Sequence, residues 1–151
     1  MIKLFELEQE EGVNKLVLEH SYKYSSKKIG SPLAISDMMK DLFRLDKKAE
    51  EYVYLLAMSN AMNCIGVFLI SKGTLSYSVL NPREIFSRVL LCASNKIILV
   101  HNHPGGSNTP SKDDKEVTER IKQTSNLLGI TLLDHIIVGE QYYSFKENGM
   151  L

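Results

Sequence analysis

Hydrophobic and polar residues alternate near the start of the chain in the way that is typical of a β-strand. Between Lys15 and Tyr24 the even-numbered residues are mainly apolar or aromatic, which predicts one face of a half-buried strand. That face would carry Leu16, Leu18, His20, Tyr22 and Tyr24. Residues 1–14 are acidic with a few apolar positions, and we expect either a short peripheral element or a frayed terminus there. We expect residues 1–24 to belong to the domain or lie peripheral to it, and residues 25–151 to form the domain itself.

The pattern changes after a predicted loop at Ser25–Ser31. Apolar residues between Pro32 and Leu45 recur at intervals of three and four, which predicts an amphipathic helix. Tyr52–Met58 and Cys64–Ile70 are predicted to form a hairpin of two strands. A turn at residues 71–73 would then lead to a third strand at Thr74–Val79.

The second half of the chain alternates helices with strands. Asn81 and Pro82 are a helix start, with Asn at the N-cap and Pro at the first helical position, and this helix should continue to about Ser94. The elements predicted after it are a buried strand at Ile97–Val100, a helix from about Ser111 to Gly129, and closing strands at Ile130–Val138 and Tyr142–Phe145. This order indicates an α/β domain in which helices sandwich a mixed sheet.

Composition and charge narrow the classes of function. The chain has 151 residues, enough for one domain with a sizeable core. Lys and Arg number 18, as do Asp and Glu, so the formal net charge is zero. A strongly basic nucleic-acid-binding protein is therefore not indicated.

The two cysteines and the start of the chain bear on the compartment. Cys64 and Cys92 lie in apolar surroundings without a C-x-x-C spacing, so we expect free, buried thiols rather than a disulfide. The acidic start has neither the charged nor the apolar region of a signal peptide. No apolar run approaches the length of a membrane span. These features predict a cytoplasmic protein, and an edge strand near Tyr142 could pair with another copy to form an oligomer.

The candidate chemistry lies between Lys96 and Asp114. His101 and His103 follow the predicted strand two residues apart, so their side chains should share one face. An Asp in the first turn of the next helix can reach back towards them. Two imidazoles and one carboxylate leave a fourth position for water, which is the layout of a catalytic zinc site. The same residues have a purely structural interpretation, because Ser111-x-x-Asp114 is also a capping box.

This spacing resembles the JAMM motif of the JAB/MPN metalloproteases. The fuller string H-N-H-P-G-G-x-x-x-P-S-x-x-D, with Leu133 to Gly139 further on reading L-D-H-I-I-V-G, is more narrowly similar to the RadC family. The resemblance runs from about Ser25 to the C-terminus and implies the three-layer fold shared with cytidine deaminases. Longer members carry an N-terminal helix-hairpin-helix region, which residues 1–45 do not resemble. Gly105 stands where the family often has Ser.

The resemblance also implies roles for individual residues. His101, His103 and Asp114 would hold Zn²⁺, and Ser111 would donate a hydrogen bond to the developing oxyanion. The family's general base is a glutamate before an early strand, which matches Glu51 here. Neighbouring Glu50 and the helix-capping Glu84 are its competitors, and a solvated surface residue is the structural alternative for Glu51 itself. His135 could support the metal site or be a core histidine with satisfied hydrogen bonds.

Two functions from different classes follow. The first is a zinc-dependent hydrolase of JAMM type that cleaves a peptide or isopeptide-like amide, with Glu51 as base and then acid. The alternative is a non-catalytic RadC-like module associated with DNA repair or with another partner. The family's historical name suggests nucleic acid as that partner, whereas the balanced charge does not support it.

Overall fold

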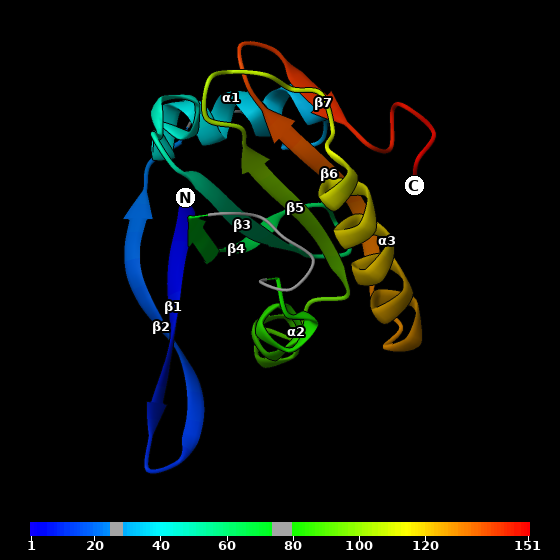
Figure 1. Ribbon diagram of the computed structural model, residues 1–151. Coiled ribbons are helices and arrows are strands. Elements are labelled where there is room, and N and C mark those ends of the chain that lie inside the picture. Colours follow the sequence, from blue (N-terminus) through cyan, green and yellow to red (C-terminus); the bar gives the residue numbers. More distant parts are fainter. Residues whose placement is uncertain (25–28, 74–79) are drawn as a thin grey trace.

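A mixed sheet organises the molecule, with helices on both of its faces (Figure 1). This computed structural model describes residues 1–24, 29–73 and 80–151. The strands within these ranges are β1 (Ile2–Glu10), β2 (Val13–Tyr22), β3 (Glu51–Met58), β4 (Cys64–Gly73), β5 (Lys96–Asn102), β6 (Thr131–Val138) and β7 (Tyr142–Ser144). The helices are α1 (Pro32–Phe43), α2 (Pro82–Leu91) and α3 (Lys112–Leu127), with a 3₁₀ turn at Leu45–Lys47. The third strand predicted at residues 74–79, like residues 25–28 of the predicted loop, lies outside the described residues.

The strand order and directions bring the termini of three strands together at one end of the sheet. Across the sheet the order is β2-β1-β4-β3-β5-β6-β7. The central strand β5 is antiparallel to β3 and parallel to β6. The first residues of β3 therefore lie beside the last residues of β5 and β6. Polar side chains at these three ends can meet although they are far apart in the sequence.

Alternating side chains divide the interior into two cores. On β3, Val53 and Leu55 face one core, which α2 and α3 cover, whereas Tyr54 and Leu56 face the other, which α1 covers. The helices contribute Ile85, Phe86, Val89, Val117 and Ile121 to the first core, and Ile35, Met38, Met39 and Phe43 to the second. The prediction of a mixed sheet between helices, in three layers, is thus confirmed.

The first 22 residues form a hairpin that departs from the predicted pattern. The acidic start is the full strand β1, which pairs with β2 along its length and with β4 at Leu4. A bulge lies between the pairs Leu4–His20 and Phe5–Leu18, and a bulge reverses the alternation of faces. Leu16 consequently packs against the first core and Tyr22 against the second. The predicted single apolar face of residues 16–24 is wrong for this reason.

The end of β4 differs from the turn predicted there. Residues 71–73, predicted as a turn, instead extend β4, because they pair with Glu51 to Val53 of β3.

Cys64 and Cys92 are free and partly buried, and burial raises the pKa of the Cys64 thiol to about 12. Among the described residues, no helix is long and apolar enough to cross a membrane.

Candidate metal centre

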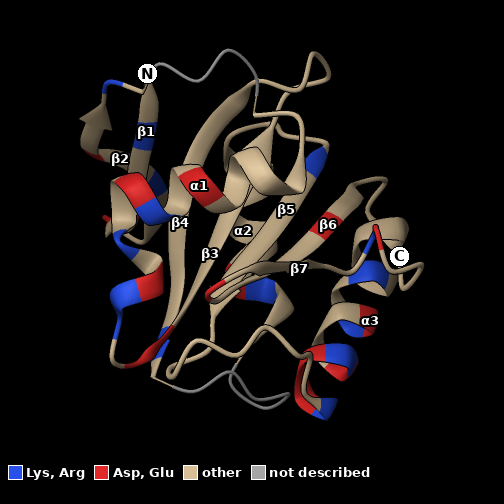
Figure 2. Cartoon of the chain, turned by 90° about the horizontal axis from the view of Figure 1, so that it is seen from above, with Lys and Arg blue, Asp and Glu red and all other residues tan. Residues whose placement is uncertain are grey.

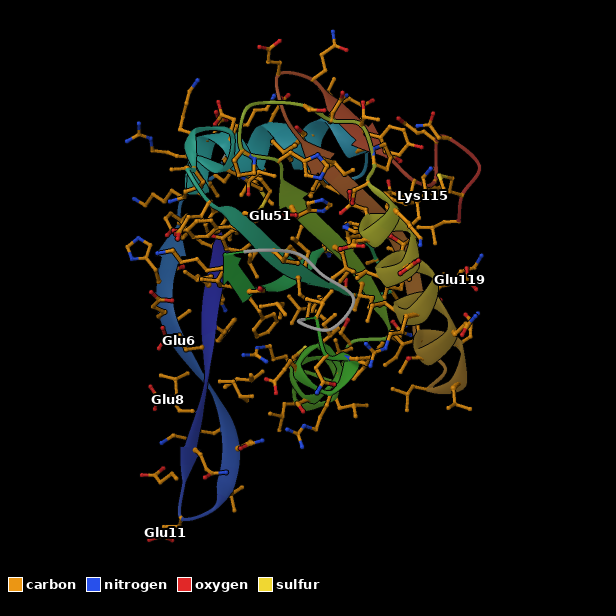
Figure 3. The ribbon with its side chains drawn as sticks, in the orientation of Figure 1. Glu6, Glu8, Glu11, Glu51, Lys115 and Glu119 are labelled. Atoms are coloured by element: carbon orange, nitrogen blue, oxygen red, sulfur yellow. The ribbon has the colours of Figure 1, made fainter. Side chains whose placement is uncertain are left out.

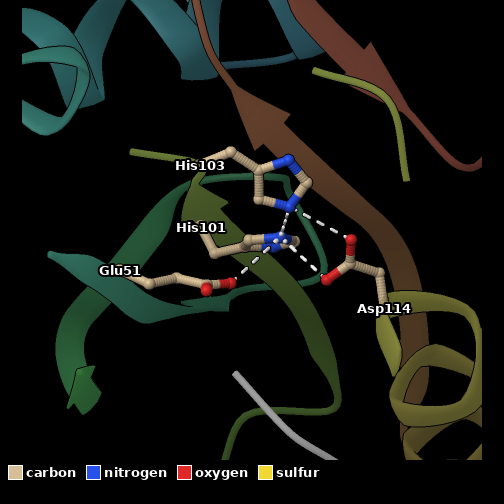
Figure 4. Close-up of side chains that lie close together, drawn as sticks. All are labelled: Glu51, His101, His103 and Asp114. Carbon is tan, nitrogen blue, oxygen red and sulfur yellow. Dashed lines mark hydrogen bonds and ion pairs between the residues drawn. The ribbon is translucent and has the colours of Figure 1, made fainter. Parts of the chain in front are cut away.

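The two histidines of the HNH string converge at the end of β5. Ile97 and Leu99 point into the core beneath α3, and the two-residue repeat of a strand carries the same direction on to His101. His101 is fully buried, whereas the side chain of His103 keeps 17% of its surface exposed. The two Nε2 atoms lie 3.0 Å apart. Both imidazoles therefore direct a nitrogen into the same space (Figure 4).

Asp114 reaches this space from the first turn of α3. Ser111 caps the helix, with its hydroxyl accepting from the Asp114 N–H, and the Asp114 carboxylate in turn accepts from the Ser111 N–H. This capping box orients the carboxylate towards the strand end. One oxygen lies 3.1 Å from Nε2 of His101 and the other 3.1 Å from Nε2 of His103. Ser111 itself stands beside the cluster and is exposed.

Glu51 is the fourth member of the cluster. It opens β3, and its Oε1 lies 3.7 Å from Nε2 of His101. Ligand atoms of Glu51, the two histidines and Asp114 all lie within 4.8 Å of one another. In contrast, Glu50 forms an ion pair with Lys72 at 3.1 Å. Figure 3 shows the other labelled glutamates, including those of the β1–β2 hairpin, well away from Glu51.

The other competitor for the role of base lies on a different element. The side chain of Glu84, on α2, pairs with Arg88 one turn further along the helix. Asn81, the N-cap of α2, accepts a hydrogen bond from the Arg83 N–H. Of the three glutamates weighed from the sequence, the structure therefore brings only Glu51 into the cluster.

Asn102 supports the position of Glu51, a role that the sequence pattern does not predict. It lies between the two histidines but points to the opposite face of β5, where it is buried. Its side-chain oxygen accepts from the Tyr52 N–H at 2.8 Å, and its nitrogen donates to the Glu50 carbonyl at 3.0 Å. The backbone on both sides of Glu51 is thus tied to the strand that carries the histidines. A buried Asn directly between two candidate ligands was the available clue.

The donor set fits a zinc ion. Ligand atoms about 2.0–2.1 Å from a tetrahedral ion are about 3.3 Å from one another. The Nε2 atoms of His101 and His103 lie 3.0 Å apart, and each lies 3.1 Å from a different oxygen of Asp114. Each of these distances is close to the separation of two ligands of such an ion. Two nitrogens and one carboxylate oxygen are also ligands that zinc favours. Glu51, at 3.7 Å from His101, is set further out than these three.

The charges of the cluster favour a cation. Burial on its own would raise the pKa of Asp114, but hydrogen bonds from His101 and His103 outweigh it, and the pKa lies well below its ordinary value. Asp114 is therefore an ionised carboxylate. The hydrogen bond to Asp114 raises the pKa of His103. Protonation of His103 would therefore compete with the binding of an ion.

A second buried histidine lies behind the first. Nε2 of His135, on β6, is 2.7 Å from Nδ1 of His101. Its own Nδ1 lies 2.6 Å from the hydroxyl of Thr118, one helical turn beyond Asp114. Burial lowers the pKa of His135 well below its ordinary value, so the ring is neutral. The sequence analysis named His135 but missed Thr118, whose place four residues after Asp114 puts it on the same helix face.

The loop between the histidines and α3 is fastened to the turn between β6 and β7. The Gly106 carbonyl accepts from the Glu140 N–H at 3.0 Å, and Asn108 donates to the Tyr142 carbonyl at 3.0 Å. Gly139 packs so closely that a Cβ atom there would lie 2.3 Å from the Gly106 oxygen. Gly106 and Gly139 therefore allow the two segments to approach closely.

Comparisons with known proteins identify the family of the chain. A model of the RadC-like JAB domain matches residues 29–150. A UPF0758 protein of Staphylococcus haemolyticus is 46% identical over 123 residues, which cover 81% of this chain and 53% of that protein. UPF0758 proteins of Rubrobacter xylanophilus and Thermotoga maritima are 37% and 35% identical, over 82% of this chain and 53% and 55% of theirs. The chain thus spans about half the length of these relatives. With its fold, its His/Asp/Glu cluster and these similarities, the chain belongs to the RadC family of JAB domains.

Proposed function

We propose that this domain is a zinc-dependent hydrolase of JAMM type that cleaves a peptide or isopeptide-like amide with water. The observation that carries the proposal is the convergence of His101, His103 and Asp114 beside Glu51. Three protein ligands beside a carboxylate suit a catalytic site, because structural zinc sites use four protein ligands.

Different side chains would bind the metal and transfer the proton. His101, His103 and Asp114 would hold the ion, which lowers the pKa of water and polarises a carbonyl when bound. Glu51 would take a proton from the attacking water and later give it to the leaving amine. The Glu51 and His103 side chains keep 15% and 17% of their surface exposed, whereas those of His101 and Asp114 are almost fully buried. A substrate can therefore approach from the side of Glu51 and His103.

Ser111 would supply a hydrogen bond to the oxygen that becomes negative during attack. Its hydroxyl accepts the N–H of Asp114, and the hydroxyl hydrogen can still be donated. Capping the helix and serving the substrate are therefore compatible roles. The exposed position of Ser111 at the end of the histidine loop supports this assignment.

The distribution of charge does not favour a DNA-associated role. Basic and acidic residues are interspersed along α3 (Figure 2), the helix that borders the cluster. Binding to phosphates uses concentrated positive charge instead. The substrate class is proposed from the site and the family.

The test compares two neighbouring glutamates. Glu51→Gln should keep its zinc and lose hydrolysis of quenched-fluorescent peptide and isopeptide substrates by about 10²–10⁴-fold, the usual contribution of a general base. Glu50→Gln is the matched control and should retain activity, because Glu50 pairs with Lys72 outside the cluster. Unchanged hydrolysis in zinc-loaded Glu51→Gln would contradict the assigned mechanism.

A further inference from the structure

The hydrogen bonds behind His101 have a defined direction. The Thr118 hydroxyl lies 2.6 Å from the Asp114 backbone carbonyl and 2.6 Å from Nδ1 of His135. A carbonyl oxygen can only accept, so the single hydroxyl hydrogen must point to Asp114. Towards His135 the hydroxyl is then an acceptor. Nδ1 of His135 therefore carries a hydrogen.

The hydrogen-bond direction set by Thr118 extends through the rings of His135 and His101. His135 is fully buried, and a buried ring without a carboxylate partner of its own is neutral. With its hydrogen on Nδ1, its Nε2 must accept from His101, whose Nδ1 is 2.7 Å away. Nδ1 of His101 is consequently the protonated nitrogen that donates. When a metal is bound, its Nε2 is then the nitrogen that offers a lone pair to the ion.

The opposite direction is disfavoured by a specific contact. If the Thr118 hydroxyl donated to His135, two oxygens would lie 2.6 Å apart with no hydrogen between them. His101 would then carry its hydrogen on Nε2, the atom that faces His103 and Asp114. A protonated nitrogen cannot bind a metal.

We infer that Thr118 and His135 are positioning residues that fix the tautomer of His101, and so keep its Nε2 ready for a divalent metal. The inference rests on the proposed metal site but requires no hydrolysis. Because Thr118 bonds to the backbone of Asp114, the same contacts couple the orientations of two ligands. His135 is therefore a functional support of the site, rather than only a satisfied core histidine.

Two variants of Thr118 and one matched control test the inference. Thr118→Val removes the acceptor, so His135 can adopt the other tautomer, and the zinc dissociation constant should rise about 10–100-fold. Thr118→Ser keeps a hydroxyl and should restore affinity to within a few-fold. Thr124→Val is the control, because Thr124 makes the same bond to the carbonyl four residues before it, at 2.9 Å to Arg120, without contacting a histidine. It should bind zinc like the wild type.

A direct reading of the tautomer makes the outcome independent of folding defects in variants. Histidine ring ¹⁵N shifts of the wild-type protein, zinc-free and zinc-loaded, should show His135 protonated at Nδ1 and bare at Nε2. A hydrogen on Nε2 of His135 would overturn the inference, and so would a Thr118→Val protein that folds and binds zinc as tightly as the wild type. Loss of hydrolysis with the expected tautomer would count against the proposed function alone.

Discussion

The backbone N–H of Ser111 donates to Oδ2 of Asp114 at 2.7 Å, and that same oxygen lies 3.1 Å from Nε2 of His103. The capping box and the metal-facing carboxylate are therefore one structure. A helix start that is favourable on its own fixes the direction of a candidate ligand before any ion binds. The two interpretations of Ser111-x-x-Asp114 that the sequence leaves open are compatible.

Replacing Ser111 should separate its two roles. Ser111→Ala removes the N-cap acceptor and should lower the free energy of unfolding by about 0.5–2 kcal/mol. If Ser111 also donates to the oxyanion, kcat should fall by about 10²–10³-fold. Urea unfolding and substrate kinetics of the zinc-loaded protein measure the two effects.

The control for this prediction is the N-cap of α1. The Ser31 side chain accepts from the Ala34 N–H at 3.2 Å, far from the cluster in the chain. Ser31→Ala should show a comparable loss of stability without the loss of kcat. Equal kinetic effects in both variants would remove Ser111 from the reaction and leave it as a cap.

The pH dependence of the metal-free protein should report on His103. Its pKa is raised above 6.5, chiefly by the hydrogen bond to Asp114. The protonated ring therefore stabilises the fold fully below the unfolded pKa of about 6.5, and this contribution is lost as pH rises through the higher folded pKa. Urea unfolding in the presence of a chelator should show this fall, and His103→Gln should lack it. An identical pH profile in the variant would contradict the prediction.

Zinc affinity should have the opposite dependence on pH. Zinc must displace the proton from His103, so the dissociation constant should rise as pH falls through the raised pKa. Competition titrations against a chromophoric chelator measure this change. An affinity that does not vary with pH in this range would show that the ion does not compete for His103.

Gly139 should matter for packing rather than for backbone freedom. An added Cβ would lie 2.3 Å from the Gly106 carbonyl oxygen, so Gly139→Ala must push the histidine loop away from β6. We expect a lower melting temperature and weaker zinc binding. Glu140→Ala is the control, because it keeps the backbone bond from residue 140 to Gly106 and should leave both quantities nearly unchanged. Wild-type behaviour of Gly139→Ala would contradict this packing role.

The predictions from sequence succeeded where local chemistry decides the structure. The apolar run before His101 and the caps at Asn81 and Ser111 all lie in the elements expected of them. The predictions failed where pairing between strands decides the structure. Residues 71–73 read as a turn but continue β4 beside β3, and the bulge near Leu18 is set by the register with β1.

The candidate site likewise combines features set by the local sequence with features set by contacts between distant elements. Two histidines at strand spacing and an acid in a capping box are local features, so their convergence could be expected. Asn102 and Thr118 act through partners on other elements, Tyr52 and His135. Their roles depend on strand order and helix placement, which no local pattern specifies.

Metal content per chain tests the claim that His101, His103 and Asp114 bind a zinc ion. Protein purified without a chelator or a metal-binding tag should contain about one zinc per chain by elemental analysis, the number that one such ligand set holds. His103→Ala should lose most of it. His20→Ala, which removes an exposed histidine of β2, should keep it. Absence of zinc from the wild type even after zinc is added back, or an unchanged content in His103→Ala, would contradict the claim.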